Sequence, residues 1–495
     1  MKTKNYSKVI CFFVVGLVAF WAGCTQEPKP KAQPGLCGMR PSQLLGVGIG
    51  GIDPVPVFKM ISFPSSFILD NMHSTEPKTC TLELVGPQVK PEQLFFRYGQ
   101  REKPLIKVEK LAPDRVRVIY PVNGRSYMLI SNEPAVEIFE DTSQWFRNGV
   151  KYRVRGGALL RREKNTWHVR ALGPALVLSA HNSSKKSVSI DMIIDNASER
   201  LSQHSSRAEA GPGKIKLART SPLALSLSGK LEPGEKVWLN LKPRKLAYPF
   251  SFVLGGDVKQ NIGIFKQLLR QVKSAADPLF MLAVGDYTRN SLPTELNTFF
   301  ENTRDIGIPV YFVKGNHETR AQGDAHFQRL FGPERFVFSI DRLFFAIIDA
   351  TDWQSTGYGI GDAQFDWLIK KLRSARKDHW KIIALHPPPH PLHGKTLRPD
   401  FNSNLNIQEA NKLKSLAVEH NVAYVVSGHA HLYARKEENG VVYLTSGGGG
   451  ATLYTHNEPE GFSIDTRSHL MVFHVGLDGI EEERITLAGT PGPIK

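Results

Sequence analysis

The sequence predicts an α/β domain in its carboxyl-terminal half, preceded by an all-β, sandwich-like region. Two patterns predict this arrangement. Between residues 78 and 242, short β-prone segments follow one another with turn residues between them, which is typical of β-sandwiches. From Pro249 onward, apolar strands alternate with helical segments in units of about thirty residues, which is typical of parallel sheets joined by crossover helices.

Length and composition indicate a globular chain of several domains. With 495 residues, 41% of them hydrophobic, the chain can bury two or three cores. Its 63 Lys and Arg against 47 Asp and Glu give a formal charge of +16, which favours anionic partners such as phosphates, acidic glycans, lipids or nucleic acid. A nucleic-acid binder is disfavoured because the sequence has no interleaved aromatic and basic motif.

The first 23 residues have the features of a secretory signal peptide. A basic head precedes an apolar run, Val9–Trp21, which is shorter than a membrane-spanning helix. The following Ala-Gly-Cys24 resembles a bacterial lipobox, which implies lipidation of the Cys24 thiol; plain secretion or a retained anchor are the alternatives. Since Thr25 rather than Asp follows this cysteine, we expect an exported lipoprotein of the bacterial cell envelope, anchored in the outer membrane and facing the periplasm or the exterior.

Residues 24–36 are rich in proline and lysine and predict a flexible tether. After maturation, Cys37 and Cys80 remain in an oxidising compartment, where they form either a disulfide or two small buried thiols. The segment Gly46–Gly51 fits a dinucleotide-binding pattern, but the two prolines that follow prevent the helix that would hold a pyrophosphate.

Two β modules are expected before the α/β domain, a β-rich domain at residues 37–175 and an immunoglobulin-like module at 176–247. The predicted strands are Thr79–Val85, Arg115–Tyr120, Ser126–Ser131, Lys151–Arg155, Trp167–Leu172, Ser187–Ile194 and Lys236–Leu241. In Lys151–Arg155 the three basic residues share one strand face, with Arg161, Arg162 and Lys164 close behind. We favour a charge-protected edge strand, with contact to an anionic envelope surface as the alternative.

The α/β domain is expected at residues 248–495. Its predicted strands are Phe252–Leu254, Leu279–Val284, Val310–Val313, Leu343–Ile348, Lys381–Leu385 and Ala423–Val426, with helices from Ile262, from Pro293, and near 363–375 and 408–420. Crossover connections make such strands parallel, so their carboxyl ends meet at one edge of the sheet, where ligands bind in open α/β folds.

Each cluster of polar residues follows one of these strands. The clusters are Asp257, Gly285-Asp286, Gly315-Asn316-His317-Glu318, His386 and Gly428-His429-Ala430-His431. Asp257 and Asp286 are 29 residues apart, and Asp286 and Asn316 are 30 residues apart, so each interval is one βα unit. The topology therefore brings carboxylates, an amide and imidazoles together, which is a ligand set for divalent metal ions.

These clusters resemble the signature of the calcineurin-like metallophosphoesterase superfamily, which reads D-x-H, G-D, G-N-H-[D/E], H and G-H-x-H. The resemblance covers about residues 248–487, and four of the five blocks match. It implies a four-layer α/β/β/α sandwich in which water activated by two divalent ions, iron, manganese or zinc, hydrolyses a phosphate ester. It implies Asp257 and His431 at the first metal, Asp286 as a bridge, Asn316, His386 and His429 at the second metal, and His317 as proton donor to the leaving oxygen.

One block departs from the pattern, because Lys259 stands where the signature has histidine. A protonated lysine cannot ligate a metal and repels one nearby. Its side chain either points away, loses its proton through desolvation, or replaces the missing metal as a fixed positive charge. Purple acid phosphatases also lack this histidine, but their compensating tyrosine is replaced here by Arg289. Arg289 would offer the phosphate a catalytic cation, with a surface salt bridge as the alternative.

Three further groups near the predicted site have simpler interpretations. They are loop histidines or substrate contacts (His390, His393), loop-forming residues with pocket lining as the alternative (Asp349, Asp352, Trp353), and closely packed backbone in preference to a phosphate cradle (Gly447–Gly450). The sequence thus predicts an exported metallophosphoesterase acting on a phosphate mono- or diester. The alternative is a non-catalytic envelope lipoprotein that binds anionic glycan or lipid, on a phosphoesterase scaffold disabled by Lys259.

Overall fold

The computed structural model describes most of the chain from residue 142 onward and the strands before it. The described residues are 40–42, 60–62, 66–70, 78–85, 95–98, 107–113, 115–122, 127–131, 142–163, 165–208, 215–259, 261–304, 306–319, 323–354, 357–392, 404–453 and 460–487. The predicted signal peptide, Cys24, the tether, Cys37 and Gly46–Gly51 lie outside them, as does the side chain of Cys80. Among the described helices, none is long and apolar enough to cross a membrane.

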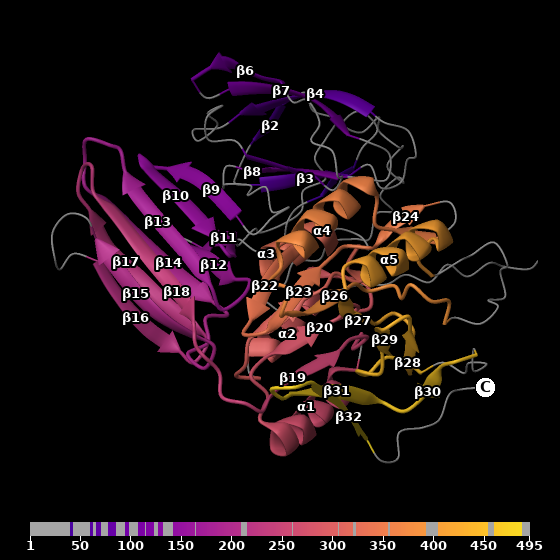
Figure 1. The fold of residues 1–495 in the computed structure, drawn as a ribbon. Helices are drawn as coiled ribbons and strands as arrows, with labels where there is room; N and C mark the ends of the chain where they lie inside the picture. Colours follow the sequence, from indigo (N-terminus) through magenta and orange to yellow (C-terminus); the bar gives the residue numbers. More distant parts are fainter. Residues whose placement is uncertain are drawn as a thin grey trace, which may run out of the picture.

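Two four-stranded sheets form the amino-terminal part, at the top of Figure 1. Their strand orders are β1-β3-β8-β5 and β2-β4-β7-β6. The strands are β1 (Arg40–Ser42), β2 (Met60–Ser62), β3 (Ser66–Asp70), β4 (Lys78–Val85), β5 (Phe95–Tyr98), β6 (Lys107–Ala112), β7 (Arg115–Val122) and β8 (Tyr127–Ser131). The three strands predicted in this region coincide with β4, β7 and β8.

A second β module consists of two five-stranded sheets, with orders β15-β18-β13-β10-β9 and β11-β12-β14-β17-β16. Its strands are β9 (Thr142–Arg147), β10 (Val150–Arg155), β11 (Gly157–Glu163), β12 (Thr166–Ala171), β13 (Leu176–Asn182), β14 (Val188–Asp195), β15 (Ser202–Ala208), β16 (Ile215–Ser221), β17 (Ala224–Leu231) and β18 (Lys236–Pro243). The boundary predicted between residues 175 and 176 is therefore wrong, because β10 pairs with β13 across it. This module begins at β9.

The basic strand β10 is not an edge strand, contrary to our prediction. It pairs with β13 on one side and with β9 on the other. The predicted alternation is present, since Lys151, Arg153 and Arg155 are exposed while Val150, Tyr152 and Val154 are buried. The charges therefore lie on the open face of a sheet, and the side chains of Arg161, Arg162 and Lys164 lie outside the described residues.

The α/β domain has two sheets between two layers of helices, as predicted. The first sheet has the order β21-β20-β19-β31-β32 and the second β22-β23-β26-β27-β29-β28-β30, with β24-β25 as a small extra pair. The strands are β19 (Phe250–Gly255), β20 (Met281–Ala283), β21 (Val310–Phe312), β22 (Phe336–Ile340), β23 (Leu343–Ile347), β24 (Asp352–Gln354), β25 (Gly357–Gly359), β26 (Trp380–Ala384), β27 (Val422–Ser427), β28 (Tyr433–Glu438), β29 (Val441–Ser446), β30 (Ser463–Asp465), β31 (His469–Val475) and β32 (Ile480–Thr486).

Helices cover the outer faces of both sheets. They are α1 (Ile262–Ala276), α2 (Pro293–Arg304), α3 (Gly323–Leu330), α4 (Asp362–Ser374) and α5 (Ile407–Glu419), with a 3-10 turn at His317–Thr319. Apolar residues of α1, α2 and α3 pack on the first sheet, and those of α4 and α5 pack on the second. Between the sheets, the ring of Phe252 stacks on Phe473 and meets the edge of Phe345. This rigid centre fixes the strand ends that carry the polar clusters.

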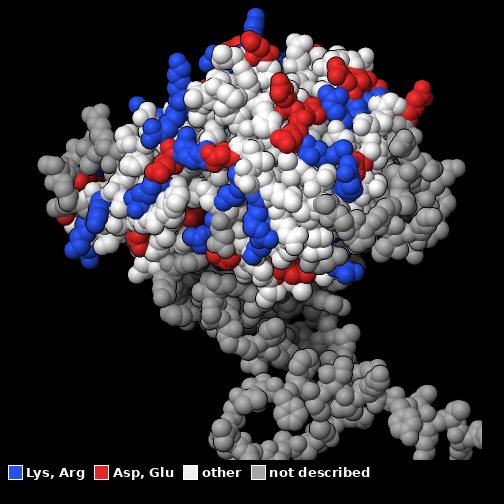
Figure 2. Space-filling model, turned by 90° about the horizontal axis from the view of Figure 1, so that it is seen from below, with Lys and Arg blue, Asp and Glu red and all other residues white. Residues whose placement is uncertain are grey.

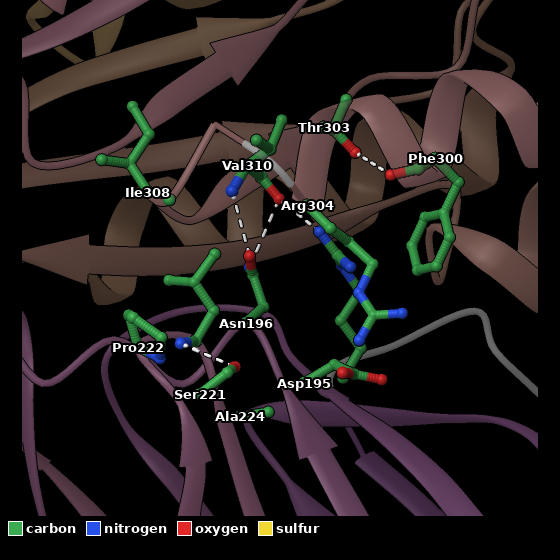
Figure 3. Close-up of a pocket in the computed structure, with 13 residues that line it drawn as sticks. Asp195, Asn196, Ser221, Pro222, Ala224, Phe300, Thr303, Arg304, Ile308 and Val310 are labelled. Atoms are coloured by element: carbon green, nitrogen blue, oxygen red, sulfur yellow. Dashed lines mark hydrogen bonds between the residues drawn. The ribbon is translucent and has the colours of Figure 1, made fainter.

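The second β module is joined to the α/β domain by polar contacts at strand β21. The buried side chain of Asn196 accepts a hydrogen bond from Val310 N at 3.0 Å and donates to Val310 O at 3.3 Å. Arg170 also donates to Val310 O, at 2.8 Å, and its guanidinium lies 5.0 Å from the ring centre of Phe312. Figure 3 shows Asn196 and Val310 beside an interdomain cavity of about 210 Å³.

Candidate metal centre

The polar clusters lie in tight loops that directly follow the strands. Asp257 follows β19, Asp286 follows β20, and His429 follows β27. All three have positive φ values, of 58°, 56° and 69°, and so does Lys259, at 47°. Such conformations are uncommon outside glycine and cost free energy, and they cluster at functional sites. The loops therefore hold these residues in directions that an ordinary turn would not give.

One group of donor atoms is already arranged as a metal would require. Asn316 Oδ1 lies 3.1 Å from His386 Nε2 and 2.9 Å from His429 Nδ1, and Asp286 Oδ1 lies 3.1 Å from His386 Nε2. Ligand atoms at right angles around an ion, with bonds of about 2.1 Å, are themselves about 3 Å apart. Asp286, His386 and His429 form one of the two clusters with metal-binding geometry among the described residues.

A backbone carbonyl orients the ring of His386 in this cluster. Its Nδ1 lies 2.6 Å from Val284 O and donates to it, which turns Nε2 towards Asp286 and Asn316. Burial lowers the pKa of His386, but the carboxylate of Asp286 raises it, and the net value is about 9. Burial likewise opposes the charge on Asp286, whereas His386 and Lys259 outweigh it and hold the pKa of this carboxyl well below its ordinary value.

The second cluster, Asp257, Asp286 and His431, contains the side chain of Lys259. The Nζ atom of Lys259 lies 2.8 Å from His431 Nε2 and 3.2 Å from Asp286 Oδ2. Only 11% of this side chain is exposed. Of the three possibilities considered for Lys259, the structure therefore excludes the one in which the side chain points away from the centre.

His317 lies at the edge of the centre, between Asp286 and the loop after it. Its Nδ1 donates to Arg289 O at 2.5 Å, and its Nε2 lies 3.7 Å from Asp286 Oδ2. The Nε2 atom thus faces the ligands, as a proton donor to a substrate there would require. The side chain of Arg289 is exposed, and it is the backbone carbonyl of Arg289 that contacts His317, so its predicted catalytic role stays a prediction.

The sequence patterns gave no role to Glu318, which organises the loop of Asp286. Its Oε2 accepts from Asp286 N at 2.8 Å and from Gly315 N at 3.0 Å, and its Oε1 accepts from Tyr287 N at 3.0 Å. Burial and the charge of Asp286 raise the pKa of Glu318 to about 8, although these backbone donors favour the ionised form. The sequence signal for this role was the position of Glu318 at the end of the Gly-Asn-His-Glu block.

Comparison with known proteins assigns this part of the chain to a family. A family model, described as calcineurin-like phosphoesterase, matches residues 250–433. Residues 250–433 form a calcineurin-like phosphoesterase domain. The match spans β19 to the start of β28 and includes all the predicted site residues. The resemblance and the fold class predicted from the sequence are therefore confirmed.

Solved structures similar to this chain are related only distantly. The purple acid phosphatase PPD1 from yellow lupin is 11% identical, covering 83% of this chain and 91% of its own, with a TM-score of 0.43. GAP50, the anchor in the inner membrane complex of Plasmodium, is 16% identical, covering 48% of this chain and 84% of its own, with a TM-score of 0.39. A search of curated proteins gave no match.

Glycines allow the ligand loops of the phosphoesterase domain to approach one another closely. A Cβ atom on Gly315 would lie 2.2 Å from Asp286 N and 2.4 Å from Asp286 Oδ1. The run Gly447–Gly450 also packs tightly, since a Cβ on Gly447 would lie 2.0 Å from Ala430 O. This agrees with the close backbone packing predicted for the run.

The other candidates that the structure describes belong to neither cluster. His390 is buried, with its ring edge-on to Tyr443 and Phe462, and burial lowers its pKa to about 4. Asp349 accepts from Thr351 N at 2.9 Å, as a loop-forming residue does. Asp352 begins strand β24 and is exposed, whereas His393 and the side chain of Trp353 lie outside the described residues.

The two clusters differ in how well they fit a divalent ion. Asp257 Oδ1 is a buried atom for which the described residues supply no hydrogen-bond partner, as in a carboxylate prepared for a cation, whereas Asp286 Oδ2 already lies 3.2 Å from the ammonium of Lys259. The cluster of Asp286, Asn316, His386 and His429 is composed of oxygen and imidazole donors, so it fits iron, manganese or zinc. In the other cluster, the ammonium of Lys259 already contacts His431 and Asp286.

Proposed function

We propose that the chain is an exported, metal-dependent phosphoesterase that hydrolyses a phosphate mono- or diester with an activated water. The observation that carries the proposal is the convergence of Asp286, Asn316, His386 and His429, whose donor atoms lie about 3 Å apart. It is supported by the calcineurin-like phosphoesterase domain, a family whose members generally hydrolyse phosphate esters at dinuclear metal centres.

These four residues would hold an iron, manganese or zinc ion. The chemistry that such an ion supplies when bound is to acidify a water and to offset charge on the phosphate. The protein contributes fixed positions, because His386 is oriented by Val284 O and the loop of Asp286 is held by Glu318. Preorganised ligands of this kind bind the ion and the substrate without further rearrangement.

His317 would protonate the leaving oxygen. Its Nδ1–H is engaged by Arg289 O, so the proton available for transfer is the one on Nε2, which faces Asp286. Asp286, 3.7 Å away, favours the imidazolium form that an acid needs. Arg289 is proposed to place its cation near the substrate phosphate from the same loop.

Turnover after metal exchange tests this function. The mature protein is stripped of metal, reloaded with manganese, zinc or iron, and offered p-nitrophenyl phosphate and bis-p-nitrophenyl phosphate. We expect hydrolysis with at least one metal, loss of at least about 100-fold in His386→Ala, and wild-type turnover in the matched control His474→Ala, which changes a histidine on β31. Absence of turnover with all three metals would contradict the proposed phosphoesterase function.

Export is a separate part of the proposal and has its own test. We propose that the chain is a lipoprotein of the bacterial outer membrane, anchored through Cys24, because a basic head, an apolar run and Ala-Gly-Cys24 open the sequence. Cell fractionation should find the wild-type protein with outer membranes and Cys24→Ser in soluble fractions. An unchanged distribution of the Cys24→Ser protein would contradict the anchor.

A second candidate function, binding of an anionic lipid surface without catalysis, is favoured by the open face of the sheet that holds β10. Lys151, Arg153 and Arg155 are exposed there, and their cross-strand neighbours include Phe146, which is 56% exposed. By contrast, Lys and Arg are mixed with Asp and Glu on the face that Figure 2 shows. Sedimentation with vesicles containing phosphatidylglycerol should retain the wild type and release a triple glutamine variant of the three basic residues; equal retention would exclude this surface.

A further inference from the structure

The main chain directs Lys259 into the metal centre. Lys259 N donates to Asp286 O at 3.1 Å, and Asp257 N donates to Gly285 O at 2.9 Å, so the loop after β19 is bound to the loop after β20. The positive φ of Lys259, 47°, belongs to this arrangement. Its side chain is 11% exposed, which means that the ammonium group is enclosed by the centre.

The ammonium uses the lone pair that a metal would need. Nδ1 of His431 donates to Thr452 O at 2.5 Å, so the lone pair of this imidazole is on Nε2. Lys259 Nζ lies 2.8 Å from that atom and donates a hydrogen bond to it. A metal bound to Nε2 would lie about 2.1 Å from it along the same lone pair. The ammonium and a metal therefore exclude each other at His431.

Charge leads to the same conclusion. Asp257 and Asp286 are the carboxylates of the cluster that contains Lys259, and Asp286 Oδ2 lies 3.2 Å from Nζ. The ammonium partly offsets them, and a divalent ion placed beside it would meet strong repulsion in a buried setting. The Asn316 side of the centre has oxygen and imidazole donors, because Asn316 Oδ1 lies 3.1 Å from His386 Nε2 and 2.9 Å from His429 Nδ1, and lysine is not part of that cluster.

We propose that this centre binds a single divalent ion, held by Asp286, Asn316, His386 and His429, and that the ammonium of Lys259 replaces the other ion as a fixed positive charge. Lys259 would thus leave one metal site in a domain whose family generally has two. The inference rests on the metal centre of the proposed function, but it does not rest on turnover. A chain that binds one ion and hydrolyses nothing would refute the function and leave this inference intact.

The number of metal ions per chain tests the inference. The purified chain is saturated with manganese or zinc, excess ion is removed, and metal is counted by mass spectrometry. We expect one ion per chain in the wild type and two in Lys259→His, because histidine restores a ligand beside Asp257, Asp286 and His431. The matched control Lys266→His changes an exposed lysine on α1 and should bind one.

Two results would overturn the inference. Two ions per wild-type chain would show that the ammonium does not exclude a metal, and one ion per folded Lys259→His chain would show that lysine is not the cause. If the Lys259→His chain does not fold, anomalous scattering from a crystal of the metal-loaded wild type decides the question. A single peak beside Asn316 supports the proposal, and a peak between Asp257 and His431 contradicts it.

Discussion

Asp286 Oδ2 lies 3.2 Å from Lys259 Nζ inside the candidate metal centre of the phosphoesterase domain. The other oxygen of the same carboxylate, Oδ1, lies 3.1 Å from His386 Nε2. One buried side chain therefore connects an ammonium on one side with an imidazole ligand on the other. This position makes Asp286 the residue on which both halves of the centre depend.

Replacing Asp286 with Asn should lower metal content and turnover together. The amide keeps the shape of the side chain but removes the charge that attracts the ion and pairs with Lys259. We expect metal affinity to fall by about 100-fold or more. The matched control is Asp362→Asn, at the exposed start of α4, which should change neither quantity. Full metal occupancy in Asp286→Asn would contradict the assigned role.

Replacing His317 with Ala should lower turnover without lowering metal content. General acids contribute about 10²- to 10⁴-fold, and most where the leaving group is poor. We therefore expect a large loss with an alkyl phosphate and a much smaller loss with p-nitrophenyl phosphate, whose leaving group needs little protonation. An equal loss with both substrates would mean that His317 has a positioning role and is not the acid.

Replacing Gly315 with Ala should destabilise the fold and disturb the centre. The added methyl group would lie 2.2 Å from Asp286 N, and the main chain cannot move without displacing that ligand. Overpacking of this kind costs about 1–3 kcal/mol in free energy of unfolding. Gly263→Ala on α1 is the control, because its Cβ would meet nothing closer than 3.7 Å and alanine favours helix. Equal melting temperatures of the two variants would contradict this packing argument.

Replacing Asn196 with Ala should weaken the junction between the second β module and the phosphoesterase domain. The change leaves Val310 N without its acceptor in a buried position, which costs about 1–3 kcal/mol. Differential scanning calorimetry should show the two parts unfolding further apart in temperature. Asn302→Ala, on the exposed side of α2, serves as control. An unaltered thermogram for Asn196→Ala would show that Asn196 does not couple the two parts.

His469 should make the protein less stable as pH falls. Burial lowers the pKa of this histidine to about 4, below its ordinary 6.5, so the unfolded chain takes up the proton first. The contribution of neutral His469 to the free energy of unfolding is therefore fully present above pH 6.5 and is lost as pH falls towards 4. This contribution is at most about 3 kcal/mol. In His469→Gln, urea unfolding should show a shallower loss over that window. Parallel pH profiles of wild type and variant would contradict this.

The sequence was most informative where local pattern and topology agree. The predicted helix starts at Ile262 and Pro293 are those of α1 and α2, and each polar cluster lies at the predicted strand end. Crossover connections leave few ways to order such strands, which is why candidate ligands remote in sequence could be grouped from the order of strands and helices alone.

Long-range pairing and side-chain direction could not be predicted in this way. Strand β31 enters the first sheet antiparallel to β19, and no local pattern identifies that partner. The boundary of the second β module was misplaced for the same reason, since the pairing of β10 with β13 is not local. The direction of Lys259 depends on its positive φ and on the bond from Lys259 N to Asp286 O, which only the assembled loops reveal.

The most direct measurement is turnover of bis-p-nitrophenyl phosphate while metal is returned stepwise to the stripped wild-type chain. It examines hydrolysis and the metal requirement in a single titration. We predict that turnover rises in proportion to added metal and levels off at one ion per chain. Absence of turnover at every level of iron, manganese and zinc would contradict the proposed phosphoesterase function.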